Sequence, residues 1–412
     1  MRTKYNLCSK LWTDLNIDLG RKNIRHCCKT LRNYEIPLTE VIEKKHNIFN
    51  FDKVSIESRK NMIHDNILPS VCHECKINEP NSIRHAWNIW NDEQIDYMRS
   101  GLEKDVNITN YIELDIGSKC DMACVYCGPW SSSAWSKELG HDVINLAIND
   151  TWQQHVLESL VDYIKRFPKD KEVLTFNILG GEPLIMPVTY DFIDMLAPIA
   201  SEFDNPPEMM ITTNLNTPKK LLNRFISVMK KYKGIFKFTI SVSIEDTGRN
   251  AEMVRHGLNW QRFENNLEVV KEHADFIGFT NTLNILSVES FHDTIDWMFE
   301  TMHDRKYSEQ WSISVNMVHS GKTDVRYLDK NYYYKDLILN SLDKYFISMG
   351  GRDSNNHDVA RVYVHIDNLF ERMGTKLPTD DFFNFWNAMG KRKQIDYYQF
   401  ELLGKLRKKH GK

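Results

Sequence analysis

The segment Cys120-Asp-Met-Ala-Cys124-Val-Tyr-Cys127 places three cysteines on one short stretch with the spacing C-x3-C-x2-C. It comes shortly after 111–116, whose alternating apolar and polar residues predict a strand, so the cysteines are expected on the loop where that strand ends. Three thiolates on one loop can bind three irons of a [4Fe–4S] cluster and leave the fourth iron without a protein ligand. The alternative is a zinc site or three ordinary thiols, although zinc prefers four protein ligands in paired C-x2-C groups.

This spacing resembles the hallmark of the radical S-adenosylmethionine superfamily, and Tyr126, the aromatic residue before the last cysteine, fits the same pattern. The resemblance implies two cofactors: a [4Fe–4S] cluster held by Cys120, Cys124 and Cys127, and S-adenosylmethionine. The amino and carboxylate groups of the latter would bind the open iron. An electron from the cluster would then split the cofactor into methionine and a 5′-deoxyadenosyl radical, which abstracts a hydrogen atom from a substrate.

Beyond the cysteines, short β-rich runs alternate with longer helical patterns. Strands are expected at 173–179, 209–213, 236–244, 276–286 and 311–318, and helices at 151–166, 190–200, 218–231, 260–273 and 291–303. Repeated strand–helix alternation predicts an α/β fold with a parallel sheet and right-handed crossovers. Together with the strand before the cysteines, the runs resemble the partial (β/α)6 TIM-like barrel of the radical family. Such barrels carry their active sites at the carboxyl ends of the strands.

Three parts are expected along the chain. Residues 1–105 lack the strand–helix rhythm and form a separate cysteine-rich module, 106–327 form the partial barrel, and 328–412 form a C-terminal helical extension. The extension is rich in aromatic residues, which are expected to pack onto the barrel.

The run Leu179-Gly-Gly-Glu-Pro183 follows the second barrel strand. Gly180 and Gly181 allow the backbone to come close to a ligand, and Glu182 can accept a charge-assisted hydrogen bond from an ammonium group. The run resembles the family's GGEP motif, which implies that it binds the amino group of the cofactor's methionine.

Further strand ends carry polar residues. Asn214 follows the third strand and resembles a family position near the cofactor, whereas Ser243 and Arg255 are separated by twelve residues, as in the peptide-modifying branch. That resemblance implies contacts of Ser243 with the ribose and of Arg255 with the carboxylate of S-adenosylmethionine. The last two strands carry other polar residues at or just beyond their ends, which could point into a cavity or cap the strands: Asn281, Asn284, Asn316 and His319. The sequence does not identify a catalytic base or a hydrogen donor.

The front of the chain carries five of the eight cysteines, and none follows Cys127. Four of the front positions resemble the SPASM/twitch module, which binds an auxiliary [4Fe–4S] cluster through four cysteines: Cys8, either Cys27 or Cys28, Cys72 and Cys75, with Cys27 preferred. In most relatives this module follows the barrel, whereas here it precedes it. A structural zinc ion on the same four cysteines is the alternative.

Bulk properties set further limits. The 412 residues are 42% hydrophobic and carry a net charge of −3, so no global positive field indicates a nucleic-acid partner. No apolar run approaches the ~20 residues that span a bilayer, and the N-terminus lacks the apolar stretch of a signal peptide. We therefore expect a cytoplasmic protein that does not bind membranes, with cysteines used for metal or redox chemistry.

The resemblance implies a radical enzyme of the oxidoreductase or peptide-modifying class, acting on a peptide or protein. The partners implied are S-adenosylmethionine, this substrate, and a reductant such as flavodoxin or ferredoxin. A nucleoside, nucleic acid or other small metabolite is the alternative substrate, although a polyanion requires a basic stripe. A catalytically silent partner protein is a third possibility, against which the intact cysteines and Glu182 argue.

Overall fold

The computed structural model describes residues 10–25, 27, 30, 36–38, 59–61, 72, 109–141, 151–318 and 321–412. The chain divides into two compact units. The first comprises Met1–Lys119, Asn145–Ile211 and Ser227–Phe238, and the second comprises Cys120–Ile144, Thr212–Ile226 and Thr239–Lys412.

The sheet of the first unit is mostly parallel. Its strands follow the order β3 (Ile36–Pro37), β2 (Asn23–Arg25), β1 (Asp14–Asp18), β4 (Tyr111–Asp115), β5 (Thr175–Leu179) and β6 (Glu208–Thr213). β1 pairs in parallel with β4, β4 with β5 and β5 with β6, whereas β2 pairs in antiparallel fashion with both of its neighbours. The carboxyl ends of β1, β4 and β5 therefore lie at one edge of this sheet.

The helices of the first unit cover the apolar face of its sheet. They are α7 (Thr151–Ile164) and α8 (Pro187–Ala200), and Phe192 of α8 packs edge to face on Phe176 of β5, with 6.1 Å between ring centroids. Pro187 occupies the first turn of α8, where its missing N–H leaves no bond unmade.

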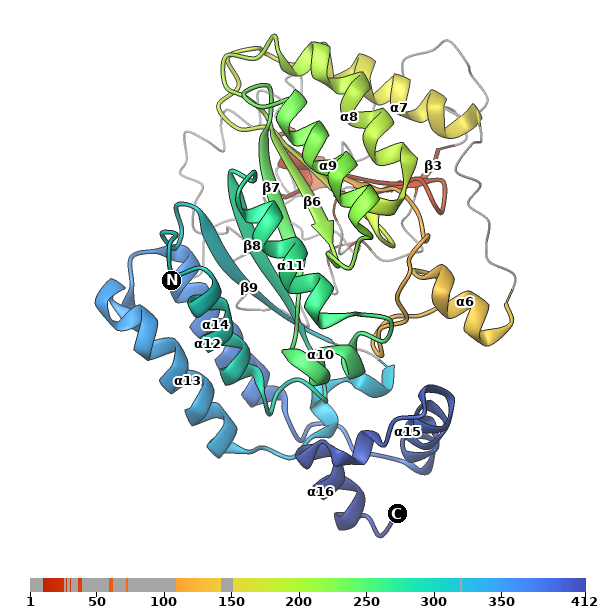
Figure 1. Ribbon diagram of the computed structural model, residues 1–412, viewed down its shortest axis with the longest axis vertical. Helices are drawn as coiled ribbons and strands as arrows, with labels where there is room; N and C mark the ends of the chain where they lie inside the picture. The colour runs from red at the N-terminus through yellow and green to blue at the C-terminus, as the bar shows by residue number, and fades with distance from the viewer. Residues whose placement is uncertain are drawn as a thin grey trace. The chain divides into compact units, whose positions relative to one another are not determined.

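The second unit repeats this arrangement with β7 (Lys237–Ser243), β8 (Phe276–Leu283) and β9 (Trp311–Met317), which pair in parallel. Residues of β8 alternate between buried and half-buried, as expected for a strand with one covered face. α11 (Trp260–Lys271) and α12 (Phe291–Thr301) cover the buried face (Figure 1). Their aromatic rings pack on the sheet, with Trp297 6.0 Å from Phe279 and Phe299 4.8 Å from Trp311 between centroids.

The predicted α/β fold with a mostly parallel sheet is confirmed and is consistent with a partial barrel. Each of the six strands and five helices expected from 111 to 318 is present, with bounds that differ by a few residues. Sequence analysis missed two short helices, α6 (Ser133–Leu139) and α10 (Gly248–Val254), which are each only seven residues long. α9 spans Lys219–Lys231.

The C-terminal extension is helical, as predicted. It contains α13 (Tyr332–Phe346), α14 (His357–Arg372), α15 (Asp380–Lys393) and α16 (Glu401–Lys409), and α12, α13 and α14 pack side by side (Figure 1). The aromatic residues of α13 pack only in part: Tyr345 stacks on Phe299 with 3.9 Å between centroids and Tyr334 is buried, whereas Tyr332 and Tyr333 are exposed.

The amino-terminal segment differs from the expected separation. β1 extends the same sheet as β4, since Leu15 and Ile17 bury their side chains beside Ile112 and Leu114. The short run Asp14–Asp18 alternates apolar and polar residues like β4 itself, which was the available signal. The three-part division of the chain stays a prediction, with this strand shared between its first two parts.

No helix of the described residues combines the length and apolarity required to cross a membrane.

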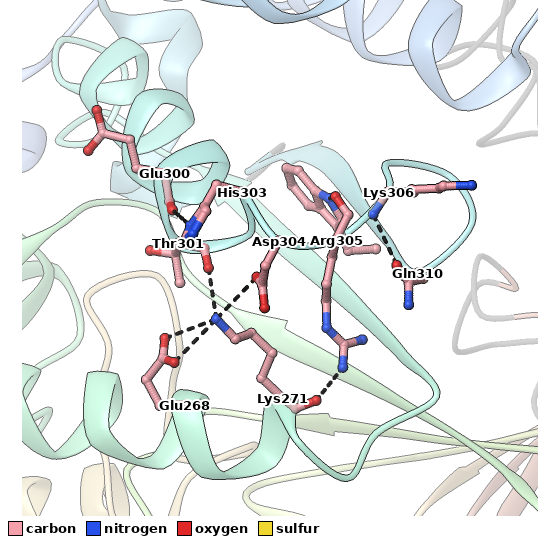
Figure 2. A network of polar contacts seen from close by, with 10 residues as sticks. Glu268, Lys271, Glu300, Thr301, His303, Asp304, Arg305, Lys306 and Gln310 are labelled. Carbon is pink, nitrogen blue, oxygen red and sulfur yellow. Dashed lines mark hydrogen bonds and ion pairs between the residues drawn. The ribbon is translucent and has the colours of Figure 1, made fainter.

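A polar network closes the amino ends of β8 and β9 (Figure 2). Figure 2 shows Lys271 at its centre: the ammonium donates to the Thr301 carbonyl at 3.0 Å and pairs with Glu268 at 3.2 Å and Asp304 at 3.5 Å. The Arg305 guanidinium donates to the carbonyl of Lys271. The network thus joins the ends of α11 and α12, at the edge of the sheet remote from the loops that follow β7, β8 and β9.

We expect Lys271→Met to lower the free energy of unfolding by about 1–2 kcal/mol, because it removes a largely buried charged donor while keeping the apolar stem. Lys306→Met is the matched control, since the Lys306 side chain is 74% exposed, and it should change stability by less than about 0.5 kcal/mol. Urea denaturation measures both. Equal effects of the two variants would contradict a stabilising role for this network.

Candidate functional site

The three cysteines of the second unit lie on a loop that starts after β4 and ends at α6. Ser133 holds its beginning, because the hydroxyl accepts from the Cys120 N–H at 3.0 Å and donates to the Cys120 carbonyl at 2.9 Å. The indole N–H of Trp135 donates to the Cys124 carbonyl at 2.8 Å. Residues of α6 and its cap therefore fix the backbone of two of the cysteines.

The middle of the cysteine loop pairs with the last residue of α10 and with the residues that follow it. The N–H of Ala123 donates to the His256 carbonyl at 2.8 Å, and that of Val125 donates to the Val254 carbonyl at 2.9 Å. These bonds give the loop a strand-like register next to Arg255.

Asp121, a residue inside the cysteine motif, is held by two side-chain amides. Asn214 and Asn216 donate to its carboxylate at 3.0 and 3.1 Å. Asn214 is 5% exposed, and its side-chain Oδ1 accepts from the backbone N–H of Asn216 at 2.8 Å. Asn214 thus positions the cysteine loop, a role that the family resemblance did not imply.

The thiols differ in exposure. Cys124 is buried, whereas Cys120 and Cys127 are half-buried. Burial raises the pKa of Cys124 to about 12 although the nearby Arg255 opposes the shift, and burial also raises the pKa of Cys127. Without metal these two thiols are neutral, and a bound iron would displace their protons.

Within the described ranges, no group of three or more His, Cys, Asp or Glu side chains is arranged around one metal ion. A cubane cluster makes a different demand, because each thiolate binds its own iron and the sulfurs stand farther apart than the ligands of one ion. Cys120, Cys124 and Cys127 provide three thiols on one loop for such a cluster.

A buried ion pair lies beside the cysteine loop. Arg255 donates through one terminal nitrogen to both carboxylate oxygens of Glu245 at 3.0 Å and to the hydroxyl of Tyr126 at 2.6 Å. The Tyr126 hydroxyl donates to Glu245 at 2.8 Å. Arg255 and Glu245 are 6% and 0% exposed, and the Nε of Arg255 has no partner among the described residues. The predicted residues Tyr126 and Arg255 are therefore brought together by a residue that sequence analysis missed.

The glycines of the Gly-Gly-Glu-Pro run allow two loops of the first unit to touch. A Cβ on Gly181 would lie 2.3 Å from the carbonyl oxygen of Lys119, and one on Gly180, at φ +139°, would lie 2.6 Å from that of Gly117. The N–H of Gly181 donates to the Gly117 carbonyl at 2.6 Å, and that of Glu182 donates to the Lys119 carbonyl at 2.8 Å. Both glycines are thus required by the close approach to 117–119, directly before the cysteine motif.

Glu182 is 1% exposed, and its carboxylate accepts from the N–H of Leu184 at 3.0 Å. It therefore caps the short 3-10 helix η4 (Pro183–Ile185). Ser243, in contrast, is half-buried at the end of β7 and shares a face with Thr280 of β8, its register partner.

Other predicted polar residues occupy strand ends. Asn281 and Asn284 are fully buried, and the amide of Asn281 donates to the Ser314 carbonyl at 3.2 Å, which is a contact within the sheet. Asn316 is half-buried, and His319 lies outside the described residues.

Sequence analysis also missed Asp115, the last residue of β4. Its carboxylate accepts from the N–H of Gly117 at 3.1 Å. In the β1–β4 pairing, Asp115 lies in register with Asp18. Burial, and next the charge of Asp18, raise the pKa of Asp115 to about 7. Its place at a strand end was the only local signal.

The front cysteines are described only in part. Cys27 is half-buried with its sulfur 3.7 Å from the hydroxyl of Thr30, and Cys72 is half-buried. The other members of the proposed set lie outside the described residues: Cys8, Cys28 and Cys75.

Comparison with known proteins matches residues 114–298 to the family described as Radical SAM superfamily. The match contains the cysteine motif, the Gly-Gly-Glu-Pro run, Ser243 and Arg255, and it supports this superfamily for less than half of the 412 residues. No curated protein matches the sequence.

Three solved structures are similar. The chain is 14% identical to anSMEcpe with bound AdoMet and Cp18Cys peptide, over 60% of this chain and 62% of that one, with a TM-score of 0.38. It is 16% identical to Streptococcus suis SuiB bound to S-adenosylmethionine, over 74% of this chain and 62% of that one, with a TM-score of 0.36. For SuiB bound to the precursor peptide SuiA, the identity is 16% over 74% of this chain and 66% of that one, with a TM-score of 0.40. The aligned part spans less than two thirds of each of these proteins.

We expect Glu245→Gln to lower the free energy of unfolding by about 3–5 kcal/mol, because Arg255 would remain as a buried charge without its counter-ion. Adding Arg255→Met should restore part of that loss, since no buried charge is then left unpaired. Glu272→Gln is the control, because Glu272 is exposed. Denaturation of the metal-free protein measures all three, and a loss for Glu245→Gln no larger than the control's would contradict a stabilising ion pair.

Proposed function

We propose that this protein is a radical S-adenosylmethionine enzyme that abstracts a hydrogen atom from a peptide or protein. The observation that carries the proposal is the cysteine loop, which lies within the segment that matches the superfamily. Hydrogen bonds hold the backbone of this loop at Cys120, at Cys124 and at the two residues that flank Cys124. Cys120, Cys124 and Cys127 would hold the cluster, which when bound supplies the electron that splits S-adenosylmethionine.

The family resemblance assigns the cofactor to loops that follow the barrel strands, as is usual for such barrels. In this proposal the backbone of Gly180 and Gly181 and the carboxylate of Glu182 receive the amino group, while Ser243 contacts the ribose. The Nε of Arg255 is buried and has no partner among the described residues, which supports the view that a bound ligand supplies its acceptor. Arg255 would bind the cofactor carboxylate with that donor and keep its ion pair with Glu245.

In this proposal the half-buried face of β8 and β9 faces the substrate, and its composition supports a peptide over a nucleic acid. On the half-buried face of β8 and β9, every described side chain is uncharged: Phe276, Gly278, Thr280, Thr282, Ser312, Ser314 and Asn316. Hydroxyl and amide groups can pair with both the donors and the acceptors of a peptide backbone. A polyanion would instead require several Lys or Arg contacts.

The front module would hold an auxiliary [4Fe–4S] cluster through Cys8, Cys27, Cys72 and Cys75. Such a cluster would accept the electron left on the substrate radical or relay electrons to it. We place the enzyme in the cytoplasm, with a flavodoxin- or ferredoxin-type donor as its reductant.

We expect the anaerobically reconstituted protein with dithionite to convert S-adenosylmethionine to equal amounts of methionine and 5′-deoxyadenosine. Cys124→Ala should abolish this conversion, because one iron loses its ligand. Ser131→Ala, a loop variant that keeps all three thiols, should cleave like the wild type. Chromatography of the products measures the rates, and wild-type cleavage by Cys124→Ala would sink the cysteine assignment.

We expect Cys72→Ser combined with Cys75→Ser to remove about four irons per chain and to stop substrate turnover, while uncoupled cofactor cleavage continues. Iron and zinc analysis of the purified protein measures this. Iron content equal to that of the wild type, with zinc lost instead, would show a structural zinc site in the front module.

A further inference from the structure

The C-terminal helices lie outside the segment that matches the superfamily, yet they contact both elements that hold the cysteine loop. The last residue of α15, Lys393, reaches α6, which follows the loop. The hydroxyl of Tyr397, four residues later, donates to the Met253 carbonyl of α10 at 3.3 Å. Met253 directly precedes Val254, whose carbonyl accepts from Val125 of the cysteine loop.

Lys393 is a buried cation. Its side chain is 0% exposed, whereas its neighbours in the last turn of α15, Lys391 and Arg392, are exposed. The ammonium forms an ion pair with Glu138 and stands 4.2 Å from the ring centroid of Trp135. The same indole donates its N–H to the Cys124 carbonyl. One aromatic ring therefore separates the Lys393 charge from the backbone of the central cysteine.

The helix dipole alone does not account for this position. A lysine at a helix C-terminus is favourable because of the helix dipole, and exposed residues such as Lys391 and Arg392 already meet that need. Taking an ammonium group out of water carries a penalty that a single carboxylate offsets only in part. Burial accordingly lowers the pKa of Lys393, while Glu138 opposes the shift and favours the charged form.

We propose that Lys393 is a positioning residue that tunes the cluster held by Cys120, Cys124 and Cys127, an inference that rests on the proposed function. A low-potential donor would supply one electron to the bound cluster without transfer of an atom, so the reduced site would be one unit more negative than the oxidised one. A buried cation nearby stabilises that added charge, because Coulomb interactions are strong where water is excluded. The C-terminal extension would thus ease reduction of a cluster that it does not ligate.

The experiment is an EPR-monitored redox titration of the reconstituted full chain, with iron content measured in parallel. We expect Lys393→Met, which keeps the apolar stem, to lower the midpoint potential. At the wild-type midpoint, the ratio of reduced to oxidised cluster should fall on the order of tenfold. Lys393→Arg keeps the charge and should retain the wild-type potential, as should Lys391→Met, the exposed control. Glu138→Gln should not lower the potential, because it removes a negative charge.

An unchanged potential in Lys393→Met, or a fall in both Lys393→Met and Glu138→Gln, would overturn the inference, because a structural contact would then explain the result. If Lys393→Met loses its cluster, Lys393→Arg decides: retained iron and potential support the charge, and lost iron contradicts it. A wild-type protein that takes up no iron would overturn the proposed function together with this inference. A shifted potential in a protein that fails to cleave S-adenosylmethionine would leave only the inference standing.

Discussion

The buried ion pair of Arg255 with Glu245 is the interaction on which the cysteine loop depends. Arg255 and Glu245 have almost no contact with water, so each requires the other, and both bind the hydroxyl of Tyr126 between two of the cysteines. The residues on either side of Arg255 accept the backbone bonds of Ala123 and Val125. Residues 254–256, at the end of α10, therefore supply the guanidinium and the hydrogen-bond acceptors that hold the loop.

The same logic explains the loops of the first unit. Their shapes are determined by contact between neighbouring strand ends: the glycine pair exists because 180–182 must lie against 117–119. The family resemblance assigns residues such as Gly181 and Glu182 to a ligand, but these residues also make structural contacts within the chain when no ligand is bound. A cofactor would then meet a site whose backbone is preorganised, so less ordering is required when it binds.

Much of this architecture could be predicted from local sequence. Period-2 and period-3.6 patterns gave the six strands and five helices, because each of these elements buries a continuous apolar face. Three features could not be predicted, because they depend on contacts between residues far apart in the chain: the tether of Asp121 to Asn214, the pairing of β1 with β4, and the burial of Lys393 against Glu138. Nothing in the residues around Asn214 distinguishes a ligand-binding amide from one that holds a neighbouring loop.

The central claim is that the cysteine loop holds a cluster with one open iron, and EPR of the dithionite-reduced anaerobic protein tests it most directly. Spectra are recorded before and after addition of S-adenosylmethionine, with iron and sulfide measured on the same sample. The account predicts a [4Fe–4S]+ signal that shifts when the cofactor is added, because the cofactor binds the open iron. A signal that the cofactor leaves unchanged, or a protein without iron after anaerobic reconstitution, would contradict it.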